Sequence, residues 1–298
     1  MAGKKFLVAG DVDEDFYALL DHIPAHDEGI LAHESFSLPG GKAGNSAYVL
    51  SSLGSDTSLF AVVGNDKRGE VALSKLKKEN VDLSLVVENG KETTLCIMML
   101  DGSGEKALIV IPSDDIYPGE EYASKLEGKL DSFDHVHMIG MNPEKIGWIA
   151  RECKKRNIPV SLDIDSANGG LERFSSVLED ADIVFLNKQG LLSLSGCVGD
   201  DGRDGLEVLS KKFPSTLLIA TLGRDGASCI AEGKLHHADA LMVKALDTTG
   251  CGDAFSAGFI HAFVDLLYPI DEALAFASKC ASISALSYGG QGGSWHDI

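Results

Sequence analysis

The chain has 298 residues, of which 26 are Lys or Arg and 45 are Asp or Glu, and its formal net charge is −19. This charge argues against a surface that binds nucleic acid or an anionic membrane, because both partners attract basic residues. Six cysteines are scattered without any Cys-x-x-Cys pair, which indicates reduced thiols in a cytoplasmic protein. The first residues lack a signal-peptide pattern and no apolar run reaches about 18 residues, so we expect no membrane span.

The first third of the chain mixes short apolar strands with helices. An apolar strand over 6–10 ends at a glycine and is followed by a run of acidic residues. A glycine turn at Gly40-Gly41 opens a helix that should end at Gly54. Further expected elements are strands over 31–38, 57–63 and 81–87 and a helix over 70–78.

An antiparallel pair interrupts this pattern. Segments 93–100 and 106–111 flank Asp101-Gly102-Ser103-Gly104, which is a hairpin signal. We therefore expect a small inserted β-sheet, formed by segments near 11–38 and 92–112, that can close over a site as a lid. Its exposed edge favours pairing with a second copy, and hence a homodimer.

From about residue 118 onwards, strands and helices alternate regularly. Alternation of this kind predicts an α/β fold in which helices cover both faces of a mostly parallel central sheet, in three layers, α/β/α. We expect a single domain over residues 1–298 that includes the small sheet. The expected strands are 135–140, 159–164, 182–187, 216–221, 227–231 and 235–243. The expected helices are 120–130, 144–156, 171–179, 206–213, 254–267 and 271–287, with a polar loop over 199–205.

His135 and His137 alternate along one of these strands. Neither histidine has cysteine or acidic neighbours at the spacing of metal ligands. We therefore expect ordinary core or surface histidines rather than a metal site.

The most informative stretch, residues 247–255, reads Asp-Thr-Thr-Gly-Cys-Gly-Asp-Ala-Phe. Here Gly250, Cys251 and Gly252 precede an apolar helix, so their N–H groups and the positive end of the helix can hold an anion such as a phosphate. Asp253 at the mouth of this site suits a hydroxyl that must lose its proton as it attacks phosphorus. A simple helix cap explains Asp253 equally well from spacing alone, so both interpretations stay open.

Two common nucleotide-binding motifs are absent from the sequence. No Gly-Lys pair is followed by Ser or Thr, as a Walker A loop requires, and no Gly-x-Gly-x-x-Gly is present. If the protein uses a nucleotide, the loop over 250–252 is the best candidate for holding its phosphates. Lys42 and Asn45, which follow the glycine turn at Gly40-Gly41, can supply donors to a polyol or a phosphate.

Together, these motifs resemble the signatures of the PfkB (ribokinase-like) carbohydrate kinase family. Residues 247–255 resemble its C-terminal signature, and Gly40-Gly41-Lys42-Ala43-Gly44-Asn45 resembles its N-terminal signature, in the same order along the chain. The resemblance implies a ribokinase-like fold and an ATP-dependent phosphotransferase with an alcohol group as acceptor. The expected acceptor is a small monosaccharide, ribose-like or fructose-like, or a sugar acid.

The resemblance also implies a role for each matching residue. Asp253 would deprotonate the acceptor hydroxyl, and the N–H groups of Gly250, Cys251 and Gly252 would hold the transferring γ-phosphate. Asp247 would sit near a monovalent-cation site of the kind that binds potassium. The residues expected to face the sugar are Asp13, Asp15, Gly41, Lys42 and Asn45. Those expected along ATP and its Mg²⁺ are Asn187, Thr221, Gly223, Gly226 and Ser278.

The chain departs from the family pattern at two informative positions. Asn187 is followed by Lys188-Gln189-Gly190, where family members often carry Asn-x-x-Glu. Cys251 replaces the usual alanine. Its thiol is predicted to be open to activation at the anion site, and hence to oxidation or alkylation, unless the cysteine merely takes the place of alanine in a packed turn. Two alternatives remain: a nucleoside kinase of the same family, whose acceptor site would need an apolar wall, and a non-catalytic sugar- or nucleotide-binding regulator.

Overall fold

The computed structural model describes residues 3–102, 106–140, 142–197, 202–295 and 298. Their largest element is an eight-stranded sheet with the order β14-β13-β12-β11-β10-β9-β1-β4. All neighbours from β4 to β12 pair in parallel, and β13 and β14 form an antiparallel pair at one edge. The predicted mostly parallel sheet is therefore confirmed. The strands are β1 (Lys5–Ala9), β4 (Asp56–Phe60), β9 (His135–Ile139), β10 (Val160–Ile164), β11 (Ile183–Asn187), β12 (Leu217–Thr221), β13 (Ala227–Ala231) and β14 (Lys234–Ala238).

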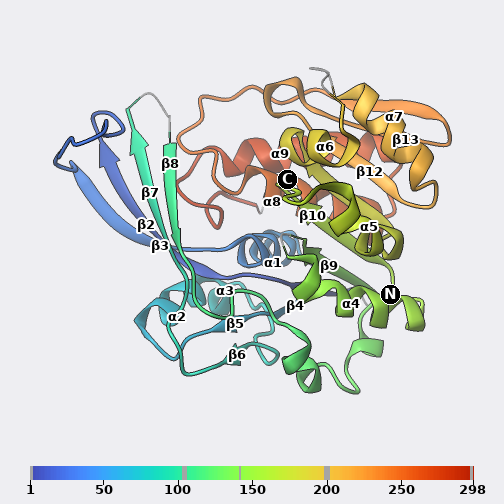
Figure 1. Cartoon of the computed structure of the whole chain (residues 1–298), viewed down its shortest axis with the longest axis horizontal. Coiled ribbons are helices and arrows are strands. Elements are labelled where there is room, and N and C mark those ends of the chain that lie inside the picture. The colour runs from blue at the N-terminus through green and yellow to red at the C-terminus, as the bar shows by residue number, and fades with distance from the viewer. Residues whose placement is uncertain (1–2, 103–105, 141, 198–201, 296–297) are drawn as a thin grey trace.

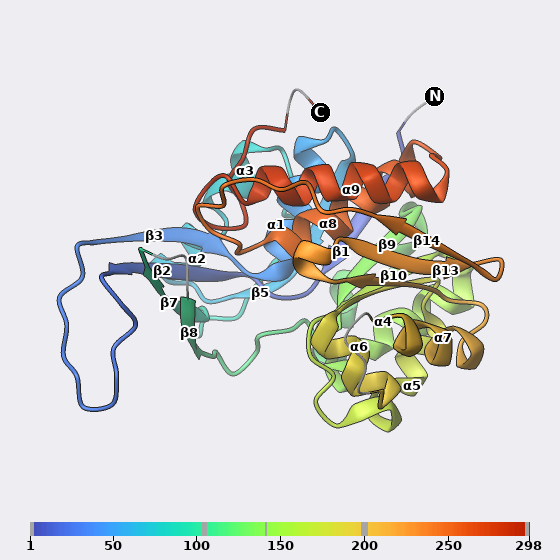
Figure 2. The same ribbon diagram turned by 90° about the horizontal axis from the view of Figure 1, so that it is seen from above.

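Helices cover both faces of this sheet, as Figure 2 shows. Because the parallel strands are buried on both faces, they read as continuous apolar runs, and each face has its own hydrophobic core. One face carries α1 (Lys42–Ser52), α3 (Ser74–Lys78), α8 (Cys251–Ile260) and α9 (Ile270–Ser284). The other carries α4 (Pro143–Arg156), α5 (Gly170–Asp180), α6 (Lys188–Ser195) and α7 (Arg203–Lys212).

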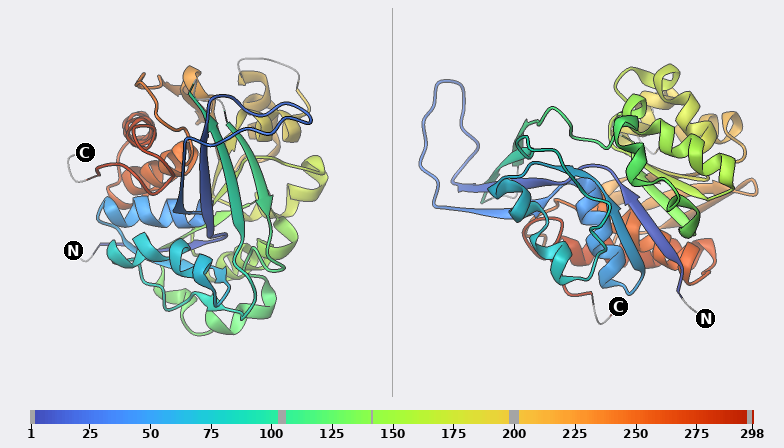
Figure 3. Two further views of the ribbon diagram at one scale, coloured as in Figure 1. Left: turned by 90° about the vertical axis from the view of Figure 1, so that its left-hand side faces the viewer. Right: turned by 90° about the horizontal axis from the view of Figure 1, so that it is seen from below.

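A four-stranded sheet projects from one side of this body (Figures 1 and 3). Its order is β3-β2-β7-β8, with β2 and β7 parallel and the other neighbours antiparallel. We call it the lid sheet. Helix α2 (Lys67–Ala72) packs against it, and a short parallel pair, β5 (Val62–Val63) and β6 (Val87–Glu88), lies nearby. The lid strands are β2 (Asp13–Leu20), β3 (Glu34–Gly40), β7 (Leu95–Asp101) and β8 (Lys106–Ile111).

Four predicted elements of the first third differ in the structure. The strand expected over 31–38 lies at Glu34–Gly40, and the strand expected over 57–63 is divided into β4 and β5. Of the segment 81–87, only Val87 lies in a strand, β6, and Asp82 forms an isolated bridge to Ser58. Between them the Asp82 carboxylate accepts a hydrogen bond from the Ser84 N–H, which bends the chain into a turn. The helix expected over 70–78 begins earlier, since Asp66 caps α2 by accepting from the Gly69 N–H, and it is divided into α2 and α3.

Several element boundaries in the rest of the chain also differ from the predicted ones. The helix expected over 120–130 is two short 3₁₀ turns, with Gly128 in a left-handed conformation between them. The strand expected over 235–243 ends at Ala238. The loop expected over 199–205 lies partly outside the described residues, and helix α7 has already begun at Arg203. The helix expected over 254–267 begins at Cys251 and continues as a π-turn over His261–Asp265.

Candidate active site

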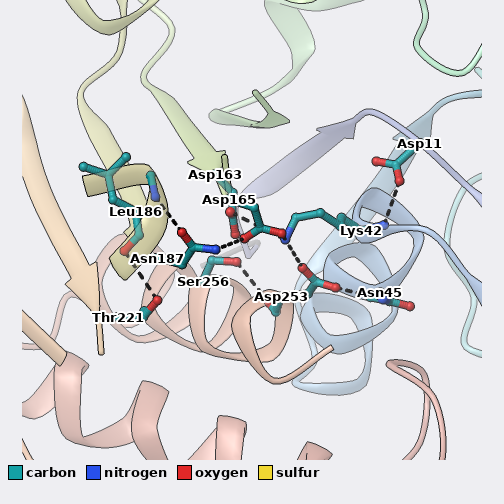
Figure 4. Close-up of polar contacts among 11 residues, drawn as sticks. Asp11, Lys42, Asn45, Asp163, Asp165, Leu186, Asn187, Thr221, Asp253 and Ser256 are labelled. Atoms are coloured by element: carbon teal, nitrogen blue, oxygen red, sulfur yellow. Dashed lines mark hydrogen bonds and ion pairs between the residues drawn. The ribbon is translucent and has the colours of Figure 1, made fainter. Parts of the chain in front are cut away.

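The candidate site lies where the carboxyl ends of the central parallel strands meet the first turn of α8 (Figure 4). Open α/β sheets bind their ligands at this edge. Asp163 and Asp165 come from the end of β10, Asn187 ends β11 and Thr221 ends β12. The sequence order of the strands therefore brings distant polar residues to one place, in front of Asp253.

The loop before α8 has the backbone of an anion site. Gly250 has φ 78°, and a Cβ there would lie 2.3 Å from the Cα of Gly290, so only glycine fits this turn. A Cβ on Gly252 would meet no atom within 4 Å, which leaves space in front of the loop. The Cys251 N–H donates to the Thr248 carbonyl at 3.3 Å, whereas those of Gly250 and Gly252 have no partner among the described residues. Two of the three predicted donors are thus available to a ligand.

Asp253 is buried in the first turn of α8 and is held by two donors. The Lys42 Nζ lies 2.9 Å from its Oδ1, and the Asn45 amide donates to its Oδ2 at 2.8 Å. A carboxylate oxygen can accept two hydrogen bonds, so one lone pair on each oxygen remains for a hydroxyl. The two contacts therefore orient the Asp253 carboxylate and still leave it able to accept a hydrogen bond from a ligand hydroxyl.

Lys42 joins Asp253 to the end of β10. Its ammonium lies 2.8 Å from Asp165 and 3.7 Å from Asp163. Burial acts to lower the pKa of Lys42, but the charges of Asp163, Asp253 and Asp165 raise it well above its usual value. Burial is also the main cause that raises the pKa of Asp163 to about 7, although Lys42 opposes it. The lysine is therefore a permanently charged bridge among three carboxylates.

A second acidic group lies on the lid-sheet side of Asp253. Asp13 and Asp15 are buried on β2, and Asp11 precedes them. Burial, and then the charge of Asp247, raises the pKa of Asp15 to about 7, and burial with the charge of Asp15 raises that of Asp13 well above its usual value. One carboxylate oxygen each of Asp11 and Asp13, and the Asn45 amide oxygen, are buried without a partner among the described residues. Such orphaned acceptors fit hydroxyl groups of a ligand.

The absence of side chains at Gly40 and Gly41 lets the backbone of the turn lie close to these acidic residues. Gly41 has φ 82°, and a Cβ there would lie 2.4 Å from the Val12 Cα. A Cβ on Gly40 would lie 2.4 Å from carboxylate oxygens of both Asp13 and Asp15. All five residues predicted to face the sugar thus lie close to Asp253 or to one another.

A cavity of about 840 Å³ lies on the other side of Asp253. Its lining includes all five residues predicted along the nucleotide, and also Asp247, Cys251 and Gly252 at the anion loop. Leu241, Met242 and Val243 form an exposed apolar strip at its rim. A cavity with phosphate donors at one end and an apolar wall at the other matches a nucleoside triphosphate. The five predicted residues are Asn187, Thr221, Gly223, Gly226 and Ser278.

The structure explains the missing glutamate after Asn187. The Asn187 side chain caps α6 by accepting from the Gly190 N–H at 2.8 Å, and its amide donates to Asp165 at 3.3 Å. A Cβ on Gly190 would lie 2.6 Å from the Ile164 carbonyl oxygen. Helix α6 is packed too closely on β10 to accept a glutamate at this position.

The prediction for the Cys251 thiol is wrong. Burial raises the pKa of this thiol to about 11, because the nearby charge of Lys106 does not offset desolvation. The thiol is therefore protonated at neutral pH. All six cysteines are free of disulfides, as expected.

The two strand histidines are core residues, as expected. Both are fully buried, and each shares a hydrogen bond with the Ser161 hydroxyl, at 2.8 Å from His135 and 2.9 Å from His137. Burial lowers the pKa of each to about 3. They stay neutral and belong to the sheet core rather than to the site.

No role was predicted from the sequence for Asp163, Asp165 or Tyr17, whereas Asp11 belongs to the acidic run that follows the first strand. Asp163 and Asp165 carried a signal, since they alternate at the end of an expected parallel strand. Tyr17 carried none, because an aromatic residue in a strand is most often part of a core. In the structure its hydroxyl donates to the Asp247 carboxylate at 2.6 Å.

Comparison with known proteins places the chain in a family. Residues 4–297 match the family described as pfkB family carbohydrate kinase. An ATP-dependent ribose-1-phosphate kinase of Halopiger xanaduensis is 29% identical over 283 residues, covering 94% of this chain and 92% of that protein. Among the described residues, no helix has the length and apolar character needed to cross a bilayer.

Solved structures agree on the fold. Arabidopsis thaliana ribokinase, in complex with ribose and ATP, superposes with a TM-score of 0.80 at 24% identity, covering 98% of this chain and 95% of that one. A Burkholderia thailandensis nucleoside kinase in complex with inosine gives 0.79 at 18% identity, with 97% and 92% covered. The ribokinase-like fold is thus confirmed, and the family match extends over nearly the whole chain. The chain belongs to the pfkB family of carbohydrate kinases, phosphotransferases that act on hydroxyl groups.

Proposed function

We propose that the protein transfers the γ-phosphate of ATP to a hydroxyl group of a small monosaccharide. One observation carries this proposal: Asp253 stands between an acidic cluster with unpartnered acceptors and a nucleotide-sized cavity, beside an anion loop whose Gly250 and Gly252 N–H groups have no partner among the described residues. A nucleophile and a phosphate bound on these two sides would meet at Asp253. We further propose that residues 1–298 act as one catalytic unit, with the lid sheet covering the acceptor side.

In this mechanism Asp253 accepts the proton of the acceptor hydroxyl as the hydroxyl attacks. Asn45 keeps the carboxylate oriented, and the N–H groups of Gly250 and Gly252 bind the oxygens of the transferring phosphoryl group. Lys42 adds a positive charge between Asp253 and the nucleotide side. Phosphoryl transfer needs positioning and charge neutralisation more than covalent participation, and these groups supply both.

The residues at the ends of β10 and β11 fit a magnesium ion that arrives with ATP. Asp163, Asp165 and Asn187 line the nucleotide cavity with carboxylate and amide oxygens, which Mg²⁺ prefers. The described residues hold no cluster of three or more His, Cys, Asp or Glu suited to a metal alone, so the ATP phosphates would supply further ligands. Bound Mg²⁺ would neutralise charge on the β- and γ-phosphates, and these side chains would hold it, directly or through water.

The acidic cluster favours a sugar over a nucleoside. Its unpartnered oxygens on Asp11, Asp13 and Asn45 fit hydroxyl groups, of which a free sugar offers more than a nucleoside does. A cluster of carboxyl groups, even when partly protonated, also disfavours an anionic acceptor. A nucleoside kinase remains the second candidate because the fold is shared with the inosine-bound enzyme. The regulator alternative is not favoured. A protein that only binds its ligand does not need a carboxylate beside an anion loop whose N–H groups are unpartnered.

Strand β8 supports the expected homodimer. It is an edge strand of the lid sheet, and its consecutive residues Leu108, Ile109, Val110 and Ile111 are each about half exposed, at 53%, 51%, 49% and 45%. An exposed apolar edge of this kind is usually covered by another strand. We propose that β8 of a second copy covers it.

The test is ADP release with Mg-ATP across a panel of free pentoses and hexoses, sugar acids, ribose 1-phosphate and nucleosides. The panel includes ribose 1-phosphate because the Halopiger relative acts on it. We expect a neutral sugar to be the best acceptor. Asp253→Asn should lower kcat by about 10² to 10⁴ while the melting temperature holds. Asp239→Asn, at an exposed position, is the matched control. Turnover near the native rate in Asp253→Asn would exclude Asp253 as the base.

A further inference from the structure

The Asp247 carboxylate is surrounded by donors from its own chain. Its Oδ1 accepts from the Thr249 N–H at 2.9 Å and from the Thr249 hydroxyl at 2.7 Å. Its Oδ2 accepts from the Tyr17 hydroxyl at 2.6 Å and from the Gly289 N–H at 3.0 Å. Two donors reach each oxygen, and a carboxylate offers about four acceptor positions in all.

These donors act on a buried, ionised group. Burial acts to raise the pKa of Asp247, but the hydrogen bonds from Tyr17, Gly289 and Thr249 lower it below its ordinary value. Burial, with the charge and hydrogen bond of Asp247, raises the pKa of Tyr17, so the phenol remains a donor. The bond between them is therefore a charge-assisted O–H···O⁻ hydrogen bond, which is among the strong kinds.

This arrangement does not fit a cation bound by the Asp247 carboxylate. The family resemblance implies a monovalent-cation site there, and a cation would need a free lone pair on one of the two oxygens. All of these positions are taken by N–H and O–H groups. The Tyr17 hydroxyl and the Gly289 N–H take the two acceptor positions on Oδ2.

The lid sheet also brings a positive charge to the same loop. The Lys106 ammonium, from β8, donates to the Thr249 hydroxyl at 3.1 Å. Tyr17 comes from β2 of the same sheet, where its ring stacks on Phe36 with centroids 5.3 Å apart. Both contacts end on the segment that leads directly into Gly250 and the anion loop. The lid sheet therefore holds that segment through two separate groups.

We propose that Tyr17 is a positioning residue that replaces a bound monovalent cation at Asp247, so that this kinase works without potassium. The Tyr17 hydroxyl keeps Asp247 and Thr249 in place, and Thr249 in turn fixes the loop over 250–252 that binds the γ-phosphate. Lys106 supplies the positive charge near the loop. This inference rests on the proposed function, because the loop is taken to bind the transferring phosphate.

The test removes only the hydroxyl. Tyr17→Phe keeps the ring and opens one acceptor position on Oδ2. Activity and melting temperature are measured in potassium, ammonium or tetramethylammonium chloride at one ionic strength. The native protein should give equal values in all three salts. In tetramethylammonium, Tyr17→Phe should show kcat about 10- to 100-fold lower and a higher KM for ATP, and potassium or ammonium should restore much of the loss.

Melting temperature provides a readout that does not need activity. Potassium should raise the melting temperature of Tyr17→Phe and leave that of the native protein unchanged. Tyr288→Phe is the matched control. The ring centroid of Tyr288 lies 6.0 Å from that of Tyr17, and the substitution removes a hydroxyl that does not bond to Asp247. It should show no response to potassium.

Two results would overturn the proposal. One is activation or thermal stabilisation of the native protein by potassium. The other is a Tyr17→Phe protein whose kcat and melting temperature ignore potassium. If Tyr17→Phe fails to fold, Lys106→Gln, at an exposed position, should lower kcat with partial recovery in potassium. If no acceptor is phosphorylated at all, the proposed function fails, while the melting measurements still decide on the cation site.

Discussion

The Lys42 ammonium lies 2.9 Å from Asp253 and 2.8 Å from Asp165, and so connects α8, the helix that follows the anion loop, to the end of β10, which lines the nucleotide cavity. Lys42 belongs to the motif over 40–45 and Asp253 to the motif over 247–255, so this ion pair joins the two motifs in space. No other cation contacts Asp253 among the described residues.

Removing this charge should affect both stability and rate. In Lys42→Met three carboxylates lose their shared cation, and breaking a mostly buried ion pair costs about 3–5 kcal/mol. We expect a lower melting temperature and a kcat reduced at least tenfold. Lys67→Met, which removes an exposed pair with Glu70, is the control and should change neither. A Lys42→Met protein as stable as the control would contradict the bridging role.

Substituting alanine for each glycine of the anion loop should affect stability at one position and catalysis at the other. Gly250→Ala places a Cβ on the backbone of Gly290 in a left-handed conformation, which should destabilise the fold by about 1–3 kcal/mol. Gly252→Ala adds a Cβ to open space, so its melting temperature should hold while kcat falls, because the methyl group enters the space proposed for the γ-phosphate. Thermal melting and steady-state kinetics of the two variants distinguish these effects. Equal kinetics in Gly252→Ala and native protein would place the phosphate elsewhere.

Much of the fold was predictable because alternating apolar strands and helices are local patterns. The anion loop was predictable because glycines and a following helix lie together in the sequence. The contacts of Lys42 with Asp163 and Asp165 were not, since they join residues more than one hundred positions apart. Tyr17 was hidden for the same reason: only the packing of the lid sheet against the loop places its hydroxyl on Asp247.

The stability of the ligand-free protein should fall between acidic and neutral pH. Burial raises the pKa values of the Asp15 and Asp163 carboxyl groups from the ordinary 3.8 to about 7. Between these values the folded state binds protons that the unfolded chain has lost, so the free energy of unfolding decreases as pH rises and levels off above about 7. Melting temperatures from pH 5 to 8.5 measure this.

Asp15→Asn should remove part of that slope, because the amide does not titrate. Asp114→Asn, at an exposed position, is the control and should leave the slope unchanged. In kinetics, the KM for the acceptor should fall as pH rises through 7, since the ionised Asp15 is the better acceptor of a sugar hydroxyl. An unchanged pH slope in Asp15→Asn would contradict the titration of this carboxyl.

Restoring the family glutamate should harm this chain. Gly190→Glu places a Cβ 2.6 Å from the Ile164 carbonyl oxygen and strains the cap that Asn187 makes on α6. We expect a melting temperature several degrees lower and a higher KM for ATP, rather than improved Mg²⁺ binding. Gln189→Glu, one position earlier, introduces the same charge without the clash and is the control for the melting temperature, since Gln189 itself lines the nucleotide cavity. A Gly190→Glu protein with native stability and tighter Mg²⁺ dependence would show that α6 can move away from β10.

The exposed edge of the lid sheet should control the assembly of the protein. Val110→Lys places a charge among the exposed apolar residues of β8, and charged edge residues oppose strand pairing. If two copies pair through β8, sedimentation at several concentrations should show a dimer for the native protein and a monomer for Val110→Lys. Leu31→Lys, in the exposed loop between β2 and β3, is the control and should remain dimeric. Because β8 also carries Lys106, which contacts Thr249, the monomeric variant should have a higher KM for ATP if pairing steadies the lid sheet. A native protein that sediments as a monomer at all concentrations would exclude this interface.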